Sequence, residues 1–294
     1  MPVVDASWEQ WLSSNVSRGC SMDSMIDAMV QAGFAGEAAR TAVGKAFGLT
    51  LAVTGAASHG AAATEAVLAK PAPSAYQYDA MPVASGNVIH AYDRDVRVLM
   101  RCEKPQVIVF GDVLSAEECN EMIERSRHRL KRSTTVNPAT GKEDVIRNRT
   151  SEGIWYQRGE DDFIARMDRR ISSLMNWPVE NGEGLQILHY GTTGEYKPHF
   201  DYFPPDQPGS SVHTAQGGQR VATLVIYLND VPDGGETIFP EAGVSVAARQ
   251  GGAVYFRYMN GQRQLDPLTL HGGAPVLGGD KWIMTKWMRE RAYG

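Results

Sequence analysis

The sequence has little of several features that define other classes of protein. It contains 3 cysteines, Cys20, Cys102 and Cys119, and no two of them stand at C-x-x-C spacing. An odd count without that spacing argues against a disulfide framework and against a structural zinc site. The net charge is -5, so the chain lacks the broad positive field that attracts phosphate backbones. We therefore expect no nucleic-acid partner.

Long apolar runs are absent as well. No stretch approaches the roughly 18 to 20 apolar residues that cross a bilayer. Residues 1–10 also lack the basic start and apolar core of a secretory signal. We therefore expect no membrane partner and a reducing, cytoplasmic setting.

The chain divides into three regions by composition and pattern. In residues 1–48, Trp8 and Trp11 and then Met22, Met25 and Met29 stand at helical offsets. This region predicts a small helical bundle with the Met and Trp side chains in its core. Residues 49–95 are rich in Ala, Gly, Ser and Pro, which is typical of a linker. Residues 96–294 read as the main domain.

The main domain begins with helices and continues with short strands. Ser115 and Glu118 form the pattern of a capping box at the start of one helix. Apolar residues at helical offsets across 163–174 predict a second helix. After Pro178, short apolar segments separated by Gly and Pro predict many strands. This order favours an α+β domain built on a β-sandwich or barrel.

A metal site is indicated by two separate segments. His199 and Asp201 stand two residues apart in EYKPHFDYF, and side chains at that spacing in a strand point to the same face. His271 follows a predicted strand, and the two glycines after it allow a tight turn. Two histidines and one carboxylate form the facial triad of Fe(II) oxygenases, which leaves coordination positions open.

Lys281 adds a positive charge to this pattern. It lies ten residues after His271 and opens the predicted strand KWIMTKW. Beside the metal, its ammonium can pair with the distal carboxylate of 2-oxoglutarate while the keto acid binds the iron. His189 and His213 have no matching partner at ligand spacing, so we expect structural or solvent-facing roles for them.

Three segments resemble the prolyl 4-hydroxylase family. They are GEYKPHFDYF, RVATLVIYLNDVPDGGETIFP and LTLHGGAPVLGGDKWIMTKW, and the resemblance runs from about residue 104 to the C-terminus. It is strongest to short bacterial members and to collagen-type catalytic domains. The resemblance implies a double-stranded β-helix, or jelly-roll, core flanked by helices. It also implies Fe(II) bound by His199, Asp201 and His271, and 2-oxoglutarate bound by Lys281, Tyr190 and Thr223.

The same resemblance implies an activity and a set of residues that contact the substrate. The activity is hydroxylation of proline in a peptide or protein, with Fe(II), O2 and 2-oxoglutarate, releasing succinate and CO2. Ascorbate is a further expected cofactor, and a homodimer is expected because short relatives often pair. Residues 136–145 resemble the lid. Candidate substrate contacts are Arg149, Ser151, Glu183, Tyr196 and Trp287.

Two alternatives stay open at the level of sequence. The substrate could be a free amino acid or small metabolite instead of a peptidyl proline. The chain could instead be a non-catalytic peptide-binding or oxygen-sensing protein, with the N-terminal bundle as its active surface. A complete metal site argues against the second alternative, because a protein without catalysis is expected to lose a ligand. Lys281 favours the prolyl branch, because related lysyl hydroxylases usually carry arginine at this position.

Overall fold

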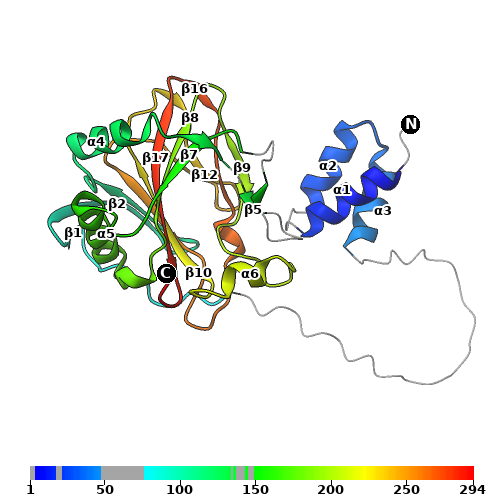
Figure 1. Cartoon of the computed structure of the whole chain (residues 1–294). Helices are drawn as coiled ribbons and strands as arrows, with labels where there is room; N and C mark the ends of the chain where they lie inside the picture. Colours follow the sequence, from blue (N-terminus) through cyan, green and yellow to red (C-terminus); the bar gives the residue numbers. More distant parts are fainter. Residues whose placement is uncertain (1–3, 18–21, 48–75, 134, 137–142, 145–148) are drawn as a thin grey trace, which may run out of the picture. The chain divides into compact units, whose positions relative to one another are not determined.

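The computed structural model divides the chain into two compact units, residues 1–72 and residues 73–294 (Figure 1). It describes residues 4–17, 22–47, 76–133, 135–136, 143–144 and 149–294. Most of the predicted linker, residues 49–75, therefore lies outside the described residues. None of the described helices is both long and apolar enough to span a membrane.

The first unit contains three helices, α1 (Ala6–Ser17), α2 (Met22–Gln31) and α3 (Gly36–Ala46). Gly33 ends α2 with a φ of 93°, a left-handed conformation that glycine adopts without strain. The core of this unit includes the predicted Met stripe, and Trp8 and Trp11 pack against it. Its fully buried members are Leu12, Met25, Met29, Phe34, Ala39 and Val43.

The second unit is built on a nine-stranded antiparallel sheet with the order β1-β2-β3-β14-β10-β17-β8-β7-β4. In that order the strands are Val88–Ala91, Arg94–Cys102, Gln106–Gly111, Ala253–Arg257, Arg220–Tyr227, Lys281–Arg289, Leu185–Tyr190, Glu152–Tyr156 and Lys131–Arg132. The sheet takes in β1, which lies inside the predicted linker. The second unit therefore includes part of residues 49–95, which were predicted as a linker.

A second sheet has the order β13-β12-β15-β9. Its strands are Val244–Val246, Thr237–Phe239, His271–Gly273 and Tyr196–His199. A core of large side chains fills the space between the two sheets, with Tyr227, Phe239, Phe256 and Tyr258 almost completely buried. Two sheets around one core give the predicted jelly-roll architecture. Two short pairs complete the strands: β11 (Asp233–Gly234) with β16 (Val276–Gly278), and β5 (Thr135–Val136) with β6 (Glu143–Asp144).

Two helices cover the other face of the large sheet, α4 (Ala116–Ser126) and α5 (Asp162–Met175) (Figure 1). The predicted capping box is present, because the Ser115 hydroxyl accepts from the Glu118 amide and the Glu118 carboxylate accepts from the Ser115 amide. Both helices bury their apolar faces against the sheet in one continuous core. Short elements fill the connections: η1 (Val179–Asn181), α6 (Ser210–Thr214), η2 (Pro240–Ala242) and η3 (Pro267–Thr269).

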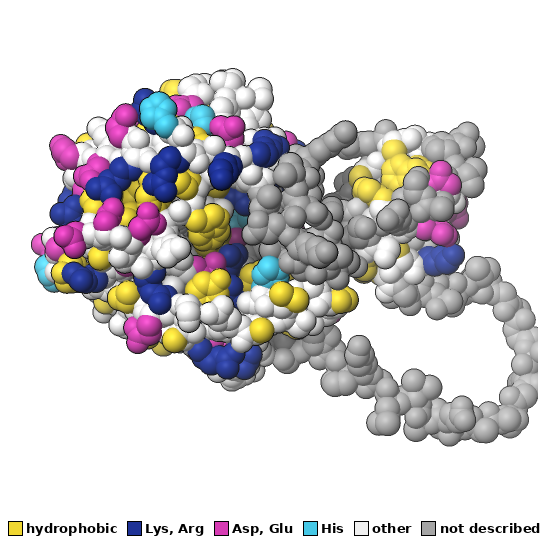
Figure 2. Space-filling view, viewed as in Figure 1, with side chains coloured by type: hydrophobic (Ala, Val, Ile, Leu, Met, Phe, Trp, Pro, Cys, Tyr) yellow, Lys and Arg dark blue, Asp and Glu magenta, His cyan; other side chains and the backbone are white. Residues whose placement is uncertain are grey.

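The surface of the second unit mixes charges of both signs. On the face seen in Figure 2, Lys and Arg side chains alternate with Asp and Glu side chains, and hydrophobic side chains lie between them. Trp155 on β7 is one of the large hydrophobic residues left exposed, with 47% of its surface accessible. Of the predicted lid, residues 137–142 and 145 lie outside the described residues.

Candidate active site

The three predicted metal ligands come together in the structure. Strands β9 and β15 are antiparallel neighbours, and their register places His199 opposite His271. The ligand atoms of His199, Asp201 and His271 all lie within 4.8 Å of one another. Each histidine Nε2 is 3.6 Å from an oxygen of Asp201. Metal–ligand bonds of about 2.1 Å place neighbouring ligands roughly 3 Å apart, so this cluster needs only a small contraction to hold an ion.

Asp201 reaches the cluster in a different way from the one predicted. Strand β9 ends at His199, and Asp201 lies in the bend that follows. The alternation of side chains along a strand therefore does not place the carboxylate. Its position is fixed by the Thr223 hydroxyl, which donates to Asp201 Oδ2 at 2.7 Å, and Arg220 donates to the Asp201 carbonyl at 3.3 Å.

The two histidines present the correct nitrogen to a metal. His199 Nδ1 lies 2.9 Å from the carbonyl of Lys197, and His271 Nδ1 lies 3.0 Å from the carbonyl of Thr269. A carbonyl only accepts, so each Nδ1 carries the proton and each Nε2 keeps a free lone pair. Hydrogen bonds of this kind orient the imidazoles of metal-binding histidines.

Protonation states in the cluster also suit a cation. Burial lowers the pKa of His271 to about 4, so its imidazole is neutral near pH 7. Burial acts to raise the pKa of Asp201, but the two histidines hold it well below its usual range, so the carboxylate is ionised. Neutral imidazole and ionised carboxylate are the forms that bind metal. The donor set, two nitrogens and one oxygen on one side of the ion, fits iron.

Lys281 lies buried at the start of β17, with 3% of its surface exposed. In the register of β17 with β8 it stands opposite Tyr190, and its Nζ is 5.8 Å from the ring centre of Tyr190. No described residue forms a hydrogen bond or an ion pair with this ammonium, and burial lowers its pKa to about 8. The Glu236 carboxylate acts on the ammonium in the opposite direction but forms no direct ion pair with it. A buried charge without a direct ion pair is unfavourable unless a ligand supplies one.

Gly273, on the strand that begins with His271, lies close to the Lys281 ammonium. Gly273 follows His271 by two residues, and a Cβ added there would lie 3.7 Å from Lys281 Nζ. The Thr237 hydroxyl, bonded to the Tyr227 hydroxyl at 2.8 Å, belongs to the same region, because Lys281 Nζ lies 5.8 Å from the Tyr227 ring centre. A dicarboxylate with one end on the metal and the other on Lys281 fits this arrangement.

Thr223 was predicted to contact the cosubstrate, and the structure gives its hydroxyl a different partner. The side chain is completely buried and bonded to Asp201 and, at 3.2 Å, to the Tyr258 hydroxyl. Thr223 therefore supports the metal ligand. Thr237, which the sequence analysis did not single out, accepts from the Tyr227 hydroxyl, and the ring centre of Tyr227 lies 5.8 Å from Lys281 Nζ.

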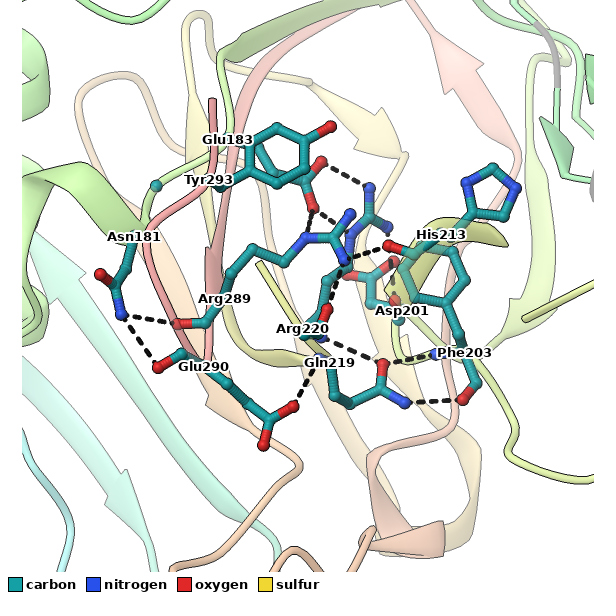
Figure 3. A network of polar contacts seen from close by, with 12 residues as sticks. Asn181, Glu183, Asp201, Phe203, His213, Gln219, Arg220, Arg289, Glu290 and Tyr293 are labelled. Atoms are coloured by element: carbon teal, nitrogen blue, oxygen red, sulfur yellow. Dashed lines mark hydrogen bonds and ion pairs between the residues drawn. The ribbon is translucent and has the colours of Figure 1, made fainter. Parts of the chain in front are cut away.

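A buried ionic network lies beside Asp201 (Figure 3). Glu183 accepts from Arg220 at 2.7 and 2.9 Å and from Arg289 at 2.6 Å. Burial acts to raise the pKa of Glu183, but the two arginines hold it below its usual range. The guanidinium of Arg220 also lies 4.1 Å from the ring centre of Trp287. Glu183 and Trp287 were predicted as substrate contacts, and the structure brings both to one wall of the site.

Arg220 and Arg289 were missed by the sequence analysis. Each stands at the end of an apolar strand, Arg220 at the start of β10 and Arg289 at the end of β17. A charged residue in such a position is a weak signal by itself, because most strands end in polar residues. Only the pairing of β10 with β17, which places Arg220 opposite Arg289, shows that the two residues belong to one network.

A second group of predicted substrate contacts lies near His199. The Tyr196 ring stacks on the His199 ring at a centroid distance of 3.6 Å, and the Arg149 guanidinium lies 4.9 Å from the Tyr196 ring centre. Arg149 also donates to Ser151 Oγ at 3.2 Å and to Gln186 at 3.2 Å. The structure therefore brings Arg149, Ser151 and Tyr196 together beside the metal cluster.

The two other histidines have structural surroundings. His189 Nε2 lies 3.0 Å from Asp280, and its ring packs on Trp282. The His213 ring stacks on Phe203 at 5.0 Å. Among the residues that the structure describes, the group of possible metal ligands is formed by His199, Asp201 and His271 alone.

Comparison with known proteins agrees with the chemistry of the site. Residues 185–289 match the 2OG-Fe(II) oxygenase superfamily. The chain is 40% identical over 209 residues to probable prolyl 4-hydroxylase 10 of Arabidopsis thaliana, across 65% of this chain and 71% of that protein. It is 36% identical over 189 residues to prolyl 4-hydroxylase subunit alpha-1 of Homo sapiens, across 64% of this chain and 35% of that protein.

Solved structures include a viral collagen prolyl hydroxylase from Paramecium Bursaria Chlorella virus-1, in complex with 2OG. It is 26% identical, with a TM-score of 0.49, and the match covers 62% of this chain and 95% of that one. A Pseudomonas putida prolyl-4-hydroxylase has a TM-score of 0.43 at 21% identity, across 63% of this chain and 92% of that one.

The fold and the site define a 2-oxoglutarate-dependent dioxygenase that uses Fe(II), 2-oxoglutarate and O2. Within that class, the chain belongs to the prolyl 4-hydroxylase family. The resemblance stated from the sequence is therefore confirmed.

Proposed function

We propose that this protein is a prolyl 4-hydroxylase that acts on proline within a peptide or protein. The observation that carries the proposal is a buried Lys281 ammonium with no hydrogen bond or ion pair among the described residues, in the same unit as a complete triad of metal ligands. The names of the relatives from Arabidopsis thaliana and Homo sapiens support proline as the substrate. When bound, iron with 2-oxoglutarate and O2 supplies the oxidant for a C–H bond, with succinate and CO2 as coproducts.

The residues of the chain have separate tasks in this proposal. His199, Asp201 and His271 hold the iron, and Thr223 fixes the carboxylate of Asp201. Lys281 binds the distal carboxylate of 2-oxoglutarate, with Tyr190 beside it. A hydrogen bond between two ionised groups in a buried site is strong, so this contact determines which end of the cosubstrate faces the metal.

Peptide contacts are assigned to the two walls of the site. One wall contains Glu183 and Trp287, joined through Arg220. The other contains Arg149, Ser151 and Tyr196. Burial raises the pKa of Tyr196 to about 12, so its hydroxyl stays protonated and can donate to a peptide carbonyl. Rigid aromatic and arginine side chains of this kind are common anchors for a peptide.

The iron assignment is tested by removing ligands one at a time. In His199→Ala and Asp201→Ala, we expect substrate-dependent succinate formation to be lost, because two ligands do not hold the ion in a reactive geometry. His90→Ala and Asp95→Ala are matched controls, since this exposed pair on β1 and β2 is 2.8 Å apart and outside the site. Full turnover in either ligand variant would contradict the assignment.

The substrate assignment is tested by mass spectrometry. Proline-rich peptides and free proline are each incubated with the enzyme, Fe(II), O2 and 2-oxoglutarate. We expect a gain of one oxygen on proline in the peptide and none on the free amino acid. Oxidation of free proline or of a small metabolite, with unmodified peptides, would favour the metabolite alternative.

A further inference from the structure

The iron ligand His271 is held by a turn that precedes it in the chain. Its Nδ1 donates to the Thr269 carbonyl at 3.0 Å. The Thr269 hydroxyl donates to the Asp266 carbonyl at 2.6 Å, and the Asp266 carboxylate caps η3 by accepting from the Leu268 amide at 2.9 Å. The orientation of the imidazole therefore depends on the turn that Asp266 organises.

Asp266 depends in turn on a residue far away in the sequence. Its side chain is buried, with 1% of the residue exposed, and a buried carboxylate needs hydrogen bonds to both oxygens. The Leu268 amide donates to one oxygen, and the Tyr78 hydroxyl donates to the other at 2.8 Å. The partner that completes this carboxylate, Tyr78, comes from within residues 49–95, which were predicted as a linker.

Tyr78 is part of a short segment fixed along its length, and we call residues 76–80 the strap. The Gln77 amide donates to Gln264 at 2.9 Å, and Asn260 donates back to the Gln77 carbonyl at 2.8 Å. Asp79 accepts from the Gly261 amide at 2.8 Å and pairs with the buried Arg257. All of these contacts fall on residues 257–266, which lead into the turn before His271.

We propose that Tyr78 is a positioning residue for the iron ligand His271. It acts through Asp266 and Thr269 and touches neither the metal nor the substrate. Without its hydroxyl, one oxygen of Asp266 loses its donor within a buried turn. The turn then relaxes, the Thr269 carbonyl shifts, and the imidazole is less well oriented. The inference rests on iron binding at the triad, and the test distinguishes failure of the positioning role from failure of the iron assignment.

The test compares two tyrosines of the strap in the full-length protein. Tyr78→Phe removes the hydroxyl that serves Asp266. Tyr76→Phe is the matched control, because the Tyr76 hydroxyl is buried and has no hydrogen-bond partner among the described residues. Co(II) replaces iron as the probe, since its affinity is measured by calorimetry and its visible absorption reports the ligand geometry.

We expect Tyr78→Phe to weaken Co(II) binding by about fivefold or more and to change the absorption spectrum. The lower bound is about half of the smallest typical effect, roughly tenfold, of removing a group that supports a ligating histidine. Tyr76→Phe should match the wild type. Equal affinity and spectra in Tyr78→Phe and the wild type would overturn the positioning role, as would equal weakening in both tyrosine variants.

Asp266→Asn probes the same contact from the other side, so the proposal does not depend on one variant. If both residues act on His271 through one hydrogen bond, the double variant Tyr78→Phe, Asp266→Asn should bind Co(II) about as well as the weaker single variant. Additive losses would overturn the relay. A wild-type protein that binds no Co(II), with His271→Ala unchanged from it, would overturn the iron assignment itself.

Discussion

Single buried side chains in the site differ in how their charge is balanced. Glu183 has two arginine partners, and Asp201 has two histidines and the Thr223 hydroxyl. Lys281, by contrast, is buried among the Tyr190 and Tyr227 rings and forms no hydrogen bond or ion pair with a described residue. The protein therefore keeps one positive charge available for a ligand carboxylate.

Lys281 predicts a pH dependence for 2-oxoglutarate binding. Burial disfavours the ammonium and lowers its pKa to about 8, so the free enzyme is charged below this pH and neutral above it. The carboxylate binds the charged form, and we expect the dissociation constant of 2-oxoglutarate to rise about tenfold per pH unit above 8. Calorimetry with the metal-loaded protein between pH 6.5 and 9.5 measures this.

Two substitutions check the origin of that dependence. Lys281→Met should bind 2-oxoglutarate weakly at every pH, because it has no charge to lose. Lys281→Arg keeps its charge throughout, so any binding that it retains should be flat across the range. A wild-type profile that stays flat through pH 9 would show that Lys281 is not the titrating group.

The strand β17 is the element that joins the parts of the site. Successive side chains of a strand point to opposite faces. Lys281, Ile283 and Trp287 face the core between the sheets, whereas Met284 and Met288 face the helices. Lys286 lies on the helix side, where its Nζ bonds Asp168 of α5 at 2.6 Å and also donates to the Glu183 carbonyl. Through Lys286, β17 therefore holds the backbone of Glu183 from the helix side of the sheet.

Replacing Lys286 should destabilise the catalytic unit strongly. Its side chain is fully buried, and its removal leaves the buried Asp168 carboxylate without its counter-ion. We expect Lys286→Met to lower the free energy of unfolding by about 3 to 5 kcal/mol. Chemical denaturation measures this, with Arg127→Met as the control.

The control removes an ion pair of the same length at the surface. Arg127 and Glu124 are 2.6 Å apart, and both side chains are largely exposed. A loss below about 1 kcal/mol is expected there, because solvent screens the pair. Similar losses in the two variants would show that the buried pair is no more important than the exposed one.

At the scale of the whole molecule, the boundary between the two units matters most. The strap and β1 lie inside the predicted linker, yet both pack on the catalytic unit. A truncation at residue 95 would therefore remove structural parts of the catalytic unit. A homodimer, a role for ascorbate and a cytoplasmic setting stay predictions.

Two deletions test this boundary. Removing residues 1–75 should leave peptide turnover unchanged, because the strap and all strands of the large sheet remain. Removing residues 1–95 should lower turnover and the metal content per chain, because Tyr78 and β1 are lost. Succinate release and iron analysis measure both. A large loss on removal of residues 1–75 would instead assign the N-terminal unit a part in catalysis.

The sequence predicted the residues whose chemistry is local and distinctive. His199, Asp201, His271 and Lys281 could be found because few functions combine these residue types in this order. The capping box of α4 could be found because it depends on two residues three apart. The capping box is contained within one short segment, and the four site residues match the pattern of a known family.

The remaining parts depend on pairing between distant segments. Thr223 meets Asp201 across the core, and Tyr78 meets Asp266 over 188 positions in the chain. Periodicity cannot reveal such contacts, because it reports only which face of an element is buried. The strap lies within the predicted linker for a related reason. It is held by hydrogen bonds to distant residues and has no periodic pattern of its own.

The Trp287 indole has a thermodynamic consequence for selectivity. Its Nε1 is buried beside Arg220 and finds no hydrogen-bond partner among the described residues. Leaving such a donor unpaired costs about 1 to 3 kcal/mol. A ligand that brings a carbonyl oxygen to this point removes that penalty, whereas one that brings a methylene group preserves it. Discrimination between them would then originate in the unfavourable state of the free enzyme.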